Sequence, residues 1–386
     1  MEGKLYLVRS ETKRKTMSQP NSPSAVAPGR LLSLDFFRGL TMFLLVAEFT
    51  ALFEHLVDPA LEGSIIHAIG MQFHHHPWAG LRFWDLIQPF FMFIVGVAIP
   101  FSVRNRRKRG QTEAQIRNHA FRRAFLLLLI GWWLYCMGPG HIAFRFQNVL
   151  AQLSVTYLIA FLIMNQPARI QLAISFGLIL LTEIIYRTFS VEGFNHPFTP
   201  NENFGTWLDL QYGGADLRGH WVSFNAIPTT AHTIWGVLAG QLLMSDQPAA
   251  KKLRTLLIAG AIGVVAGYAL HPVTPIIKRI CTSSFMLVSG GWTLLALALS
   301  YWLIDMKGWK RGVLFFAIVG MNPLFIYLFG HVGGAGMLRD IFAPMTHSLL
   351  GWMGEAPMAA VTSLVVLAAM WYICYWLYKR KIFIKI

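Results

Sequence analysis

Three adjacent histidines, His74 to His76, precede Pro77-Trp78 and are followed by Asp85 at the start of a long apolar run. Three neighbouring imidazoles cannot all face one point, so a metal site built from them alone has poor geometry. One neutral imidazole at a membrane boundary, oriented by a carboxylate such as Asp85, can accept a proton from an attacking amine or hydroxyl. The spacing alone favours a structural or weakly metal-binding cluster, with proton transfer as the alternative.

Charged and polar side chains inside apolar segments form a second set of candidates, because such groups are costly in a membrane and usually face the interior of a helix bundle. Glu48 lies about halfway along the first long apolar segment, and Asp35 and Arg38 lie at its inner end. Glu48 either takes part in proton chemistry or is a protonated carboxyl bonded to a neighbouring helix. Asn322 and His331, in a later segment, can equally form hydrogen bonds between helices.

The composition indicates which elements position these residues. Of 386 residues, 55% are hydrophobic and only 13% are charged, whereas soluble domains carry roughly a quarter charged residues. The net charge of +15 comes from Lys and Arg that cluster between apolar runs, as in the cytoplasmic loops of membrane proteins. We therefore attribute the positive charge to membrane topology and expect no nucleic-acid partner. The three cysteines lack metal-ligand spacing, and no metal is expected.

Ten apolar runs are long enough to cross a hydrocarbon core of roughly 30 Å. They lie near 39–57, 86–103, 119–137, 148–165, 170–188, 229–245, 254–271, 284–305, 313–331 and 357–378. The predicted fold class is all-α, a polytopic transmembrane bundle of about ten helices. Several Gly and Pro residues interrupt 332–356, which we interpret as a surface or re-entrant segment.

Charge alternation predicts the orientation, because cytoplasmic connections carry the Lys and Arg residues. The basic groups lie in the tail before the first span and at 104–123, 251–254, 307–311 and 379–381. All of them face the cytoplasm if ten spans leave both termini inside. Residues 1–29 are then a disordered basic cytoplasmic tail before a membrane domain at 30–386. Lys278 and Arg279 break the rule on the external side, which makes them candidates for function.

The longest external connection, 189–228, is predicted to be an ordered cap. Connections longer than about a dozen residues are usually functional or disordered, and this one holds Trp207, Tyr212 and Trp221 among amides and carboxylates. Aromatic rings of this kind suit the face of a sugar, and they equally anchor a loop at a membrane interface. Both interpretations stay open.

Several blocks of the sequence match a known pattern. The run RLLSLDFFRGL at 30–40 resembles the opening of the heparan-alpha-glucosaminide N-acetyltransferase family and its bacterial relatives. The later matching blocks are HHPWAGL with WDLIQPFFMFIVG at 75–96, RFQNVLAQLSVTY at 145–157, DLRG through GVLAG at 216–240, 272–285 with Trp292, and GMNP at 320–323. The opening alone is moderately specific, whereas the ordered set is strong and covers nearly everything after residue 29.

The resemblance implies transfer of an acetyl group from cytoplasmic acetyl-CoA, as co-substrate, to an amino sugar on the external side. It places the family's active-site histidine at His75, which reverses the preference drawn from spacing alone. Asp85 or Glu48 would orient the imidazole or balance its charge. Family members commonly carry Asn where this chain has Glu48, and a carboxylate donates no hydrogen bond unless it is protonated, so acceptor or rate can differ.

The same resemblance suggests which residues hold the two substrates. Arg38, beside Asp35, and the basic group that begins at Arg104 would bind the CoA phosphates. Asn322 would position substrate. Acceptor contacts are expected from the external side. The candidates there are Arg145, Asp216, Lys278 and His331.

We therefore predict a multi-pass protein of the bacterial inner membrane that transfers acetyl groups to a free amino sugar, an N-acetylhexosamine hydroxyl or a glycan end. Its expected partners are that acceptor and membrane lipid, and a homodimer is allowed. One alternative is a proton-coupled transporter of small sugars, with Glu48 and His75 as the proton path. Another is an inactive relative that binds acyl-CoA as a sensor, which the missing Asn would favour.

Overall fold

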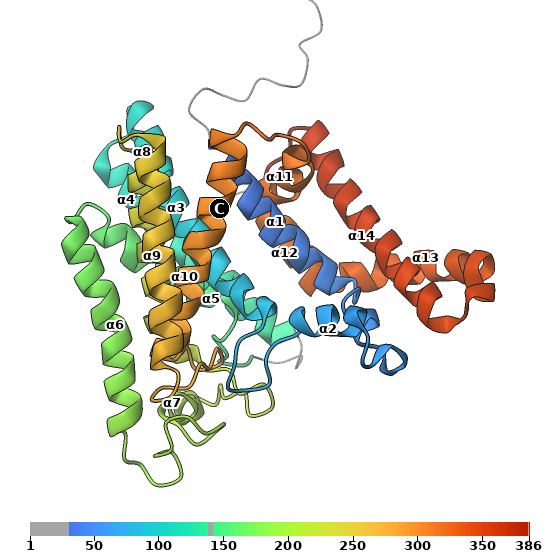
Figure 1. Cartoon of the computed structure of the whole chain (residues 1–386), viewed down its shortest axis with the longest axis horizontal. Helices are drawn as coiled ribbons and strands as arrows, with labels where there is room; N and C mark the ends of the chain where they lie inside the picture. Colours follow the sequence, from blue (N-terminus) through green and yellow to red (C-terminus); the bar gives the residue numbers. More distant parts are fainter. Residues whose placement is uncertain (1–30, 138–141, 385) are drawn as a thin grey trace, which may run out of the picture. The chain divides into compact units, whose positions relative to one another are not determined.

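The structure is a computed structural model that describes residues 31–137, 142–384 and 386. The predicted tail at 1–29 lies outside these residues. Every named element in the described part of the chain is a helix, which confirms the predicted all-α class. Figure 1 shows the helices in sequence colours.

The longer helices are α1 (Leu32–Phe49), α2 (Ile65–Gln72), α3 (Ile87–Lys108), α4 (Glu113–Met137), α5 (Val149–Ile163), α6 (Ala168–Thr188), α7 (Phe204–Gln211), α8 (Ala226–Met244), α9 (Ala249–Leu270), α10 (Ser283–Ser300), α11 (Val313–Met321), α12 (Pro323–His331), α13 (Gly334–Leu350) and α14 (Glu355–Lys379). Short helical turns are η1 (Glu54–Val57), η2 (Pro59–Leu61), η3 (Phe83–Leu86), η4 (Ser223–Asn225), η5 (Tyr301–Met306) and η6 (Gly351–Met353).

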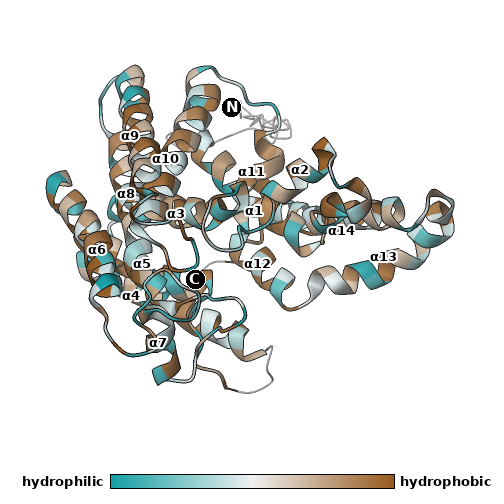
Figure 2. Cartoon of the chain, turned by 60° about the horizontal axis from the view of Figure 1, so that its bottom comes forward, coloured by the Kyte–Doolittle hydropathy of each residue, from teal (hydrophilic) through white to brown (hydrophobic). Residues whose placement is uncertain are grey.

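Within the described residues, six helices are long and apolar enough to cross a membrane, so the chain is a multi-pass helical membrane protein. They are Phe83–Lys108, Glu113–Met137, Ala168–Thr188, Ala249–Leu270, Ser283–Met306 and Glu355–Lys379. Hydrophobic residues run along the lengths of α6 and α9 in Figure 2. Most residues of the apolar stretch in each of these two helices are not buried against other parts of the chain, as expected for a surface that contacts lipid.

The predicted count of about ten spans is too high by length and composition. Six described helices meet that test, or seven if the bent pair α11 and α12 is one span. α1 contains the charged residues Asp35, Arg38 and Glu48, α5 has only 15 residues, and α8 carries polar side chains such as Thr230 and His232. Most side chains of α8 are buried, and polar groups in a membrane bundle are best accommodated in such an interior.

The first helix begins and ends earlier than predicted. α1 covers Leu32–Phe49 rather than 39–57, and turns with η1 follow it. Glu48 is therefore the next-to-last residue of α1 rather than a residue in the middle of a span. Ala51 has a positive φ of 56°, a conformation that non-glycine residues rarely adopt. The chain turns sharply here, and Glu48 lies beside Trp84 at the start of η3 and α3.

Glycine allows the central helices to approach closely. A Cβ atom on Gly96 of α3 would lie 2.1 Å from the carbonyl oxygen of Thr233 in α8, and Gly236 makes the reciprocal contact with α3. α9 and α10, which lie side by side in Figure 1, meet in the same way at Gly263 and Gly291. Small residues at such crossings allow backbone contact between membrane helices, and α3 and α8 are thereby held in fixed register.

The segment 332–356 is mainly helical despite its Gly and Pro residues. α13 contains Pro344 and packs against α14, as Figure 1 shows. It exposes Met337, Ile341 and Met345 at intervals of four residues, which lie on one face of a helix. Before it, α11 and α12 are bent by 71° at the break that contains Asn322.

Candidate active site

A buried carboxylate organises the connection between α2 and α3. Asp85 in η3 is 1% exposed, and its Oδ2 atom accepts hydrogen bonds from the backbone N–H groups of Arg82 at 2.9 Å and His76 at 3.2 Å. Its Oδ1 atom lies 3.0 Å from Nδ1 of His75. The side chain of Arg82 donates to the carbonyl of His75 at 3.1 Å. These bonds satisfy the buried charge and fix the histidine that the sequence singled out.

A second connection brings a lysine to the same imidazole. The chain between α9 and α10 pairs with the histidine connection through an antiparallel bridge between Ala79 and Ile277. Next to this bridge, the Nζ atom of Lys278 lies 3.1 Å from Nδ1 of His75 and 3.8 Å from Oδ1 of Asp85. The lysine side chain is only 6% exposed. The predicted candidates His75, Asp85 and Lys278 are therefore brought together.

The surroundings of His75 favour its neutral form. Burial lowers the pKa of its imidazole, and the positive charge of Lys278 adds to that effect, so that the pKa falls to about 4 against the opposing influence of Asp85. Burial likewise lowers the pKa of Lys278 to about 8. The imidazole ring is still 34% exposed. With Nδ1–H donating to Asp85, the neutral imidazole has its proton on Nδ1, and Nε2 is the ring atom left to act as a base or nucleophile.

The third catalytic candidate, Glu48, reaches the same region from the end of α1. Its Oε1 atom accepts a hydrogen bond from the indole N–H of Trp84 at 2.8 Å. Both residues line a cavity of about 220 Å³ together with Ala51, Phe53, Glu54, Phe73, His74 and His75. Phe53 and Phe73 stack with their ring centroids 4.3 Å apart. The cavity thus combines carboxylates, an imidazole and aromatic faces.

The predicted cap at 189–228 contacts the histidine connection. Trp221 packs its indole edgewise against His75, with centroids 5.4 Å apart, and lies within cation–π distance of Lys278 and Arg279. Trp78 donates from its indole N–H to the carbonyl of Phe198 at 2.7 Å. The cap therefore places an aromatic side chain directly over the candidate base.

The cap is itself anchored to the bundle by a buried carboxylate. Asp209 in α7 is 0% exposed, and it accepts hydrogen bonds from the side-chain amide of Gln147 at 2.7 Å and the backbone N–H of Ser223 at 2.9 Å. The hydroxyl of Tyr212 also donates to it. Burial raises the pKa of Asp209 above its usual range. These bonds connect the cap to the segment that leads into α5.

Three predicted substrate residues lie outside the His75, Asp85 and Lys278 cluster. His331 packs edge-on against Phe49, the residue after Glu48, with ring centroids 4.9 Å apart. Asp216 lies in the cap and accepts from the backbone N–H of Gly219 at 3.0 Å. Arg145 lies in the segment before α5. Both Arg145 and Asp216 are near enough to the α4 residue Tyr135 to act on it electrostatically.

The predicted CoA-binding residues lie farther away. Asp35 and Arg38 form an ion pair of 3.0 Å near the start of α1, and Asp35 is about 20 Å from Glu48 along the helix axis at 1.5 Å per residue. The side chain of Asn322 donates to the carbonyl of Ile382 at 3.0 Å and accepts from the N–H of Ile384 at 2.9 Å. Asn322 thus binds the C-terminal segment at the helix break.

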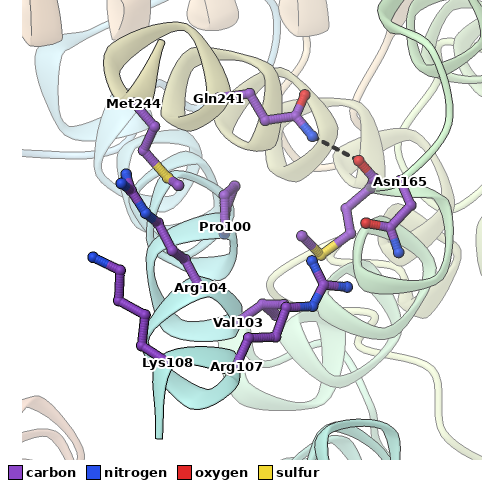
Figure 3. A pocket seen from close by; sticks show the side chains of 9 residues that line it. Pro100, Val103, Arg104, Arg107, Lys108, Asn165, Gln241 and Met244 are labelled. Carbon is purple, nitrogen blue, oxygen red and sulfur yellow. Dashed lines mark hydrogen bonds between the residues drawn. The ribbon is translucent and has the colours of Figure 1, made fainter. Parts of the chain in front are cut away.

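Arg104 belongs to a separate basic cavity at the far end of α3. The cavity measures about 460 Å³, and Figure 3 shows Arg104, Arg107 and Lys108 around its left and lower edges, with Gln241 and Met244 of α8 above them. Its remaining lining residues are Pro100, Val103, Met164 and Asn165. No carboxylate is among these residues, so the cavity suits an anion.

Sequence reasoning missed part of this arrangement. The sequence indicates Trp84 only as part of a motif, and Trp221 only as a cap aromatic that suits a sugar or a membrane interface. The signal for Lys278 and Arg279 was their external position against the usual charge bias. Nothing local indicated that Lys278 contacts His75, because the two residues are 203 positions apart.

Comparisons with known proteins point to one kind of enzyme over part of the chain. No family model matches. The chain is 30% identical over 170 residues to the heparan-alpha-glucosaminide N-acetyltransferase of Mus musculus, which covers 39% of this chain and 23% of the mouse protein. It is 32% identical over 139 residues to the Homo sapiens protein of the same name, a match that covers 34% of this chain and 18% of the human protein. The matched region is thus under a quarter of the length of these relatives.

Proposed function

We propose that this protein is a membrane acetyltransferase that moves an acetyl group from acetyl-CoA to an amino sugar or a glycan end. The observation that carries the proposal is the geometry of His75, whose Nδ1 atom lies between Asp85 and Lys278 and whose ring borders the cavity lined by Glu48. Partial similarity to two N-acetyltransferases supports the same reaction class.

A neutral imidazole can promote this transfer by two routes. In the first, Nε2 of His75 takes a proton from the acceptor as it attacks the thioester carbonyl, and returns it to the sulfur as the C–S bond breaks. In the second, Nε2 attacks the thioester, CoA leaves, and the acetyl-imidazole passes its acetyl group to the acceptor. Asp85 assists either route, because a carboxylate at Nδ1 orients the ring and stabilises positive charge on it.

The acceptor would occupy the cavity beside His75. Aromatic faces pack against the apolar face of a sugar, and Glu48 would attract the ammonium group of an amino sugar and help to remove its proton. The cap would close over the acceptor through Trp221. Asp216, Arg145 and His331 are proposed as outer contacts for a longer glycan.

The CoA phosphates would bind in the basic cavity at Arg104, with Arg38 and Asp35 as a further contact. From Asp85 to Arg104, α3 advances about 30 Å at 1.5 Å per residue. The roughly twenty bonds from the 3′-phosphate of CoA to its sulfur extend to about 25 Å at about 1.2 Å per bond. Acetyl-CoA bound there therefore approaches His75 only if it is almost fully extended along the bundle.

The proposed orientation places the basic end of α3 in the cytoplasm and His75 on the external side of a bacterial inner membrane. Lys and Arg accumulate on the cytoplasmic side of membrane proteins, and the end of α3 carries Arg104, Arg106, Arg107 and Lys108. Acetyl-CoA is made in the cytoplasm, so this orientation lets the acetyl group, rather than the whole donor, reach an external acceptor.

The direct test is acetyl transfer by the purified full chain in detergent, with labelled acetyl-CoA and a panel of amino sugars and glycan ends. His75→Ala should lower turnover by roughly a hundredfold to ten-thousandfold, the usual contribution of a general base, with CoA binding retained. His347→Ala, on the exposed part of α13, is the matched control. Near-normal turnover in His75→Ala would remove His75 from the mechanism.

A proton-coupled sugar transporter is the second candidate, favoured by the 71° bend between α11 and α12. Transporters often place substrate at the break of discontinuous helices. Sugar uptake into vesicles without CoA release or acetylated product would select this function. Acetylated product from the wild-type protein would select the enzyme.

A further inference from the structure

The chain between α9 and α10 is built to place one lysine at the site. Besides the bridge at Ile277, the hydroxyl of Thr282 donates to the carbonyl of Pro275 at 2.7 Å, and the N–H of Cys281 donates to the carbonyl of Lys278 at 3.1 Å. Cys281 has a positive φ of 49°, a strained conformation for a residue with a Cβ atom. A tight turn held in this way leaves Lys278 little freedom to move.

The lysine faces the imidazole more closely than it faces the carboxylate. Its Nζ atom is 3.1 Å from Nδ1 of His75, 3.5 Å from the carbonyl oxygen of Trp84 and 3.8 Å from Asp85. Asp85 also accepts two backbone N–H bonds, from His76 and Arg82. Protonation of His75 would therefore place a second cation next to the buried lysine, and like charges at this distance disfavour the charged imidazole.

We propose that Lys278 is a positioning residue that keeps the His75 imidazole neutral and turns its free Nε2 atom toward the substrates. The inference rests on the proposed role of His75 in acetyl transfer. A histidine held in this way stays available as a base or nucleophile well below the pH at which an ordinary imidazole is protonated. Loss of the lysine charge would raise the pKa of His75 toward its usual range, while the effect of burial would remain.

Other charged groups also act on His75 and Lys278. Those facing the pair from the neighbouring elements are Asp85, Arg82, His76, His74, Glu48, Glu54, Arg279 and Cys281. Asp85 favours the charged imidazole, whereas burial, Lys278 and Arg279 oppose it. Lys278 is the nearest cation to the ring. Its removal should therefore raise the pKa of His75, because only burial and Arg279 would then oppose Asp85.

The test measures the protonation state of His75 directly. Diethyl pyrocarbonate modifies neutral imidazole but not imidazolium, and mass spectrometry of the 73–82 peptide can follow His75 in the full chain between pH 4.5 and 8. In the wild type, His75 should react fully down to about pH 5, because its pKa is about 4. In Lys278→Met the reaction midpoint should rise by roughly one to two pH units, whereas Lys278→Arg should keep it low.

Lys252→Met is the matched control, because Lys252 also donates to a backbone carbonyl, at 3.0 Å, but on α9. A wild-type midpoint near pH 6.5 would overturn the proposal even if Lys278→Met failed to fold. The proposal would also be overturned by an unchanged midpoint in Lys278→Met, provided that the variant elutes as a single species and is therefore folded. A merely structural lysine would lower yield without moving the midpoint.

A parallel assay separates this inference from the proposed function. Transfer of labelled acetyl to glucosamine is followed over the same pH range, and the acidic limb of kcat/KM should move upward with the modification midpoint in Lys278→Met. A shifted midpoint together with a wild-type protein that acetylates nothing would reject the acetyltransferase and retain the Lys278–His75 coupling. Acetyl transfer by the wild type, together with an unshifted modification midpoint in Lys278→Met, would retain the acetyltransferase and reject the Lys278–His75 coupling.

Discussion

The two ends of α3 carry charge in different ways. Just before its first residue, Asp85 is 1% exposed, and it is bonded by the imidazole of His75 and the backbone N–H groups of His76 and Arg82. At its other end, Arg104, Arg107 and Lys108 surround a larger, more open cavity that no carboxylate lines. The first region has its charges balanced within the protein, whereas the second, where the exposed carboxylate of Glu113 pairs with Arg107, keeps a net positive charge for a ligand to balance.

This difference indicates a division of labour. Buried, mutually bonded charges hold one proton position precisely enough for chemistry, because their geometry is fixed before substrate arrives. Exposed cations hold a multivalent anion, and their attraction is weakened by salt. We therefore expect substitutions at the beginning of α3 to reduce turnover and substitutions at its end to reduce donor affinity.

The largest expected effect is at Asp85. Asp85→Asn keeps the shape of the side chain but removes the charge that Nδ1 of His75 and Lys278 face, and it leaves the lysine buried without a counterion. We expect kcat/KM for acetyl transfer to fall by roughly a hundredfold to ten-thousandfold. CoA affinity, measured by calorimetry, should be unchanged. An equal loss of kcat/KM and of CoA affinity would show that the two ends of α3 do not act separately.

Parts of this arrangement follow from sequence and parts do not. Long apolar runs predicted helices such as α6 and α9, because a membrane helix needs about 20 apolar residues. The runs at 148–165 and 229–245 also predicted spans, but the helices there, α5 and α8, are short or polar and lie mostly buried among other helices. Asp85 was predictable beside the histidines, since only ten residues separate it from His75.

Long-range pairing was not predictable. Lys278 reaches His75 through a bridge between Ala79 and Ile277, and no local pattern specifies which connections will meet. Asn322 illustrates the reverse case, because its place in an apolar segment suggested a hydrogen bond between helices, and the family resemblance suggested a substrate contact. In the structure its amide bonds with the backbone at 382 and 384. Unpaired backbone groups at a chain end satisfy such an amide as well as a ligand does.

The next effect in size is at Arg104. Arg104→Gln removes one charge-assisted hydrogen bond to a CoA phosphate and should weaken acetyl-CoA binding by about tenfold, with kcat at saturation unchanged. Arg254→Gln, on the exposed start of α9, is the matched control. If the 3′-phosphate is the group bound, dephospho-acetyl-CoA should bind the wild type and Arg104→Gln equally. A tenfold difference with that analogue would mean that Arg104 binds another part of the donor.

The smallest expected effect has the opposite sign. Glu113 at the start of α4 accepts two hydrogen bonds from Arg107, at 2.7 and 3.0 Å, and so competes with any anion for that guanidinium. Glu113→Gln should tighten acetyl-CoA binding by about twofold at low salt, in line with the small value of exposed ion pairs. The gain should vanish at high ionic strength, where exposed charges are screened. Calorimetry at two salt concentrations measures the gain in affinity and its loss at high salt. Weaker binding by Glu113→Gln at low salt would show that Glu113 orients Arg107 for the donor rather than competing with the donor for Arg107.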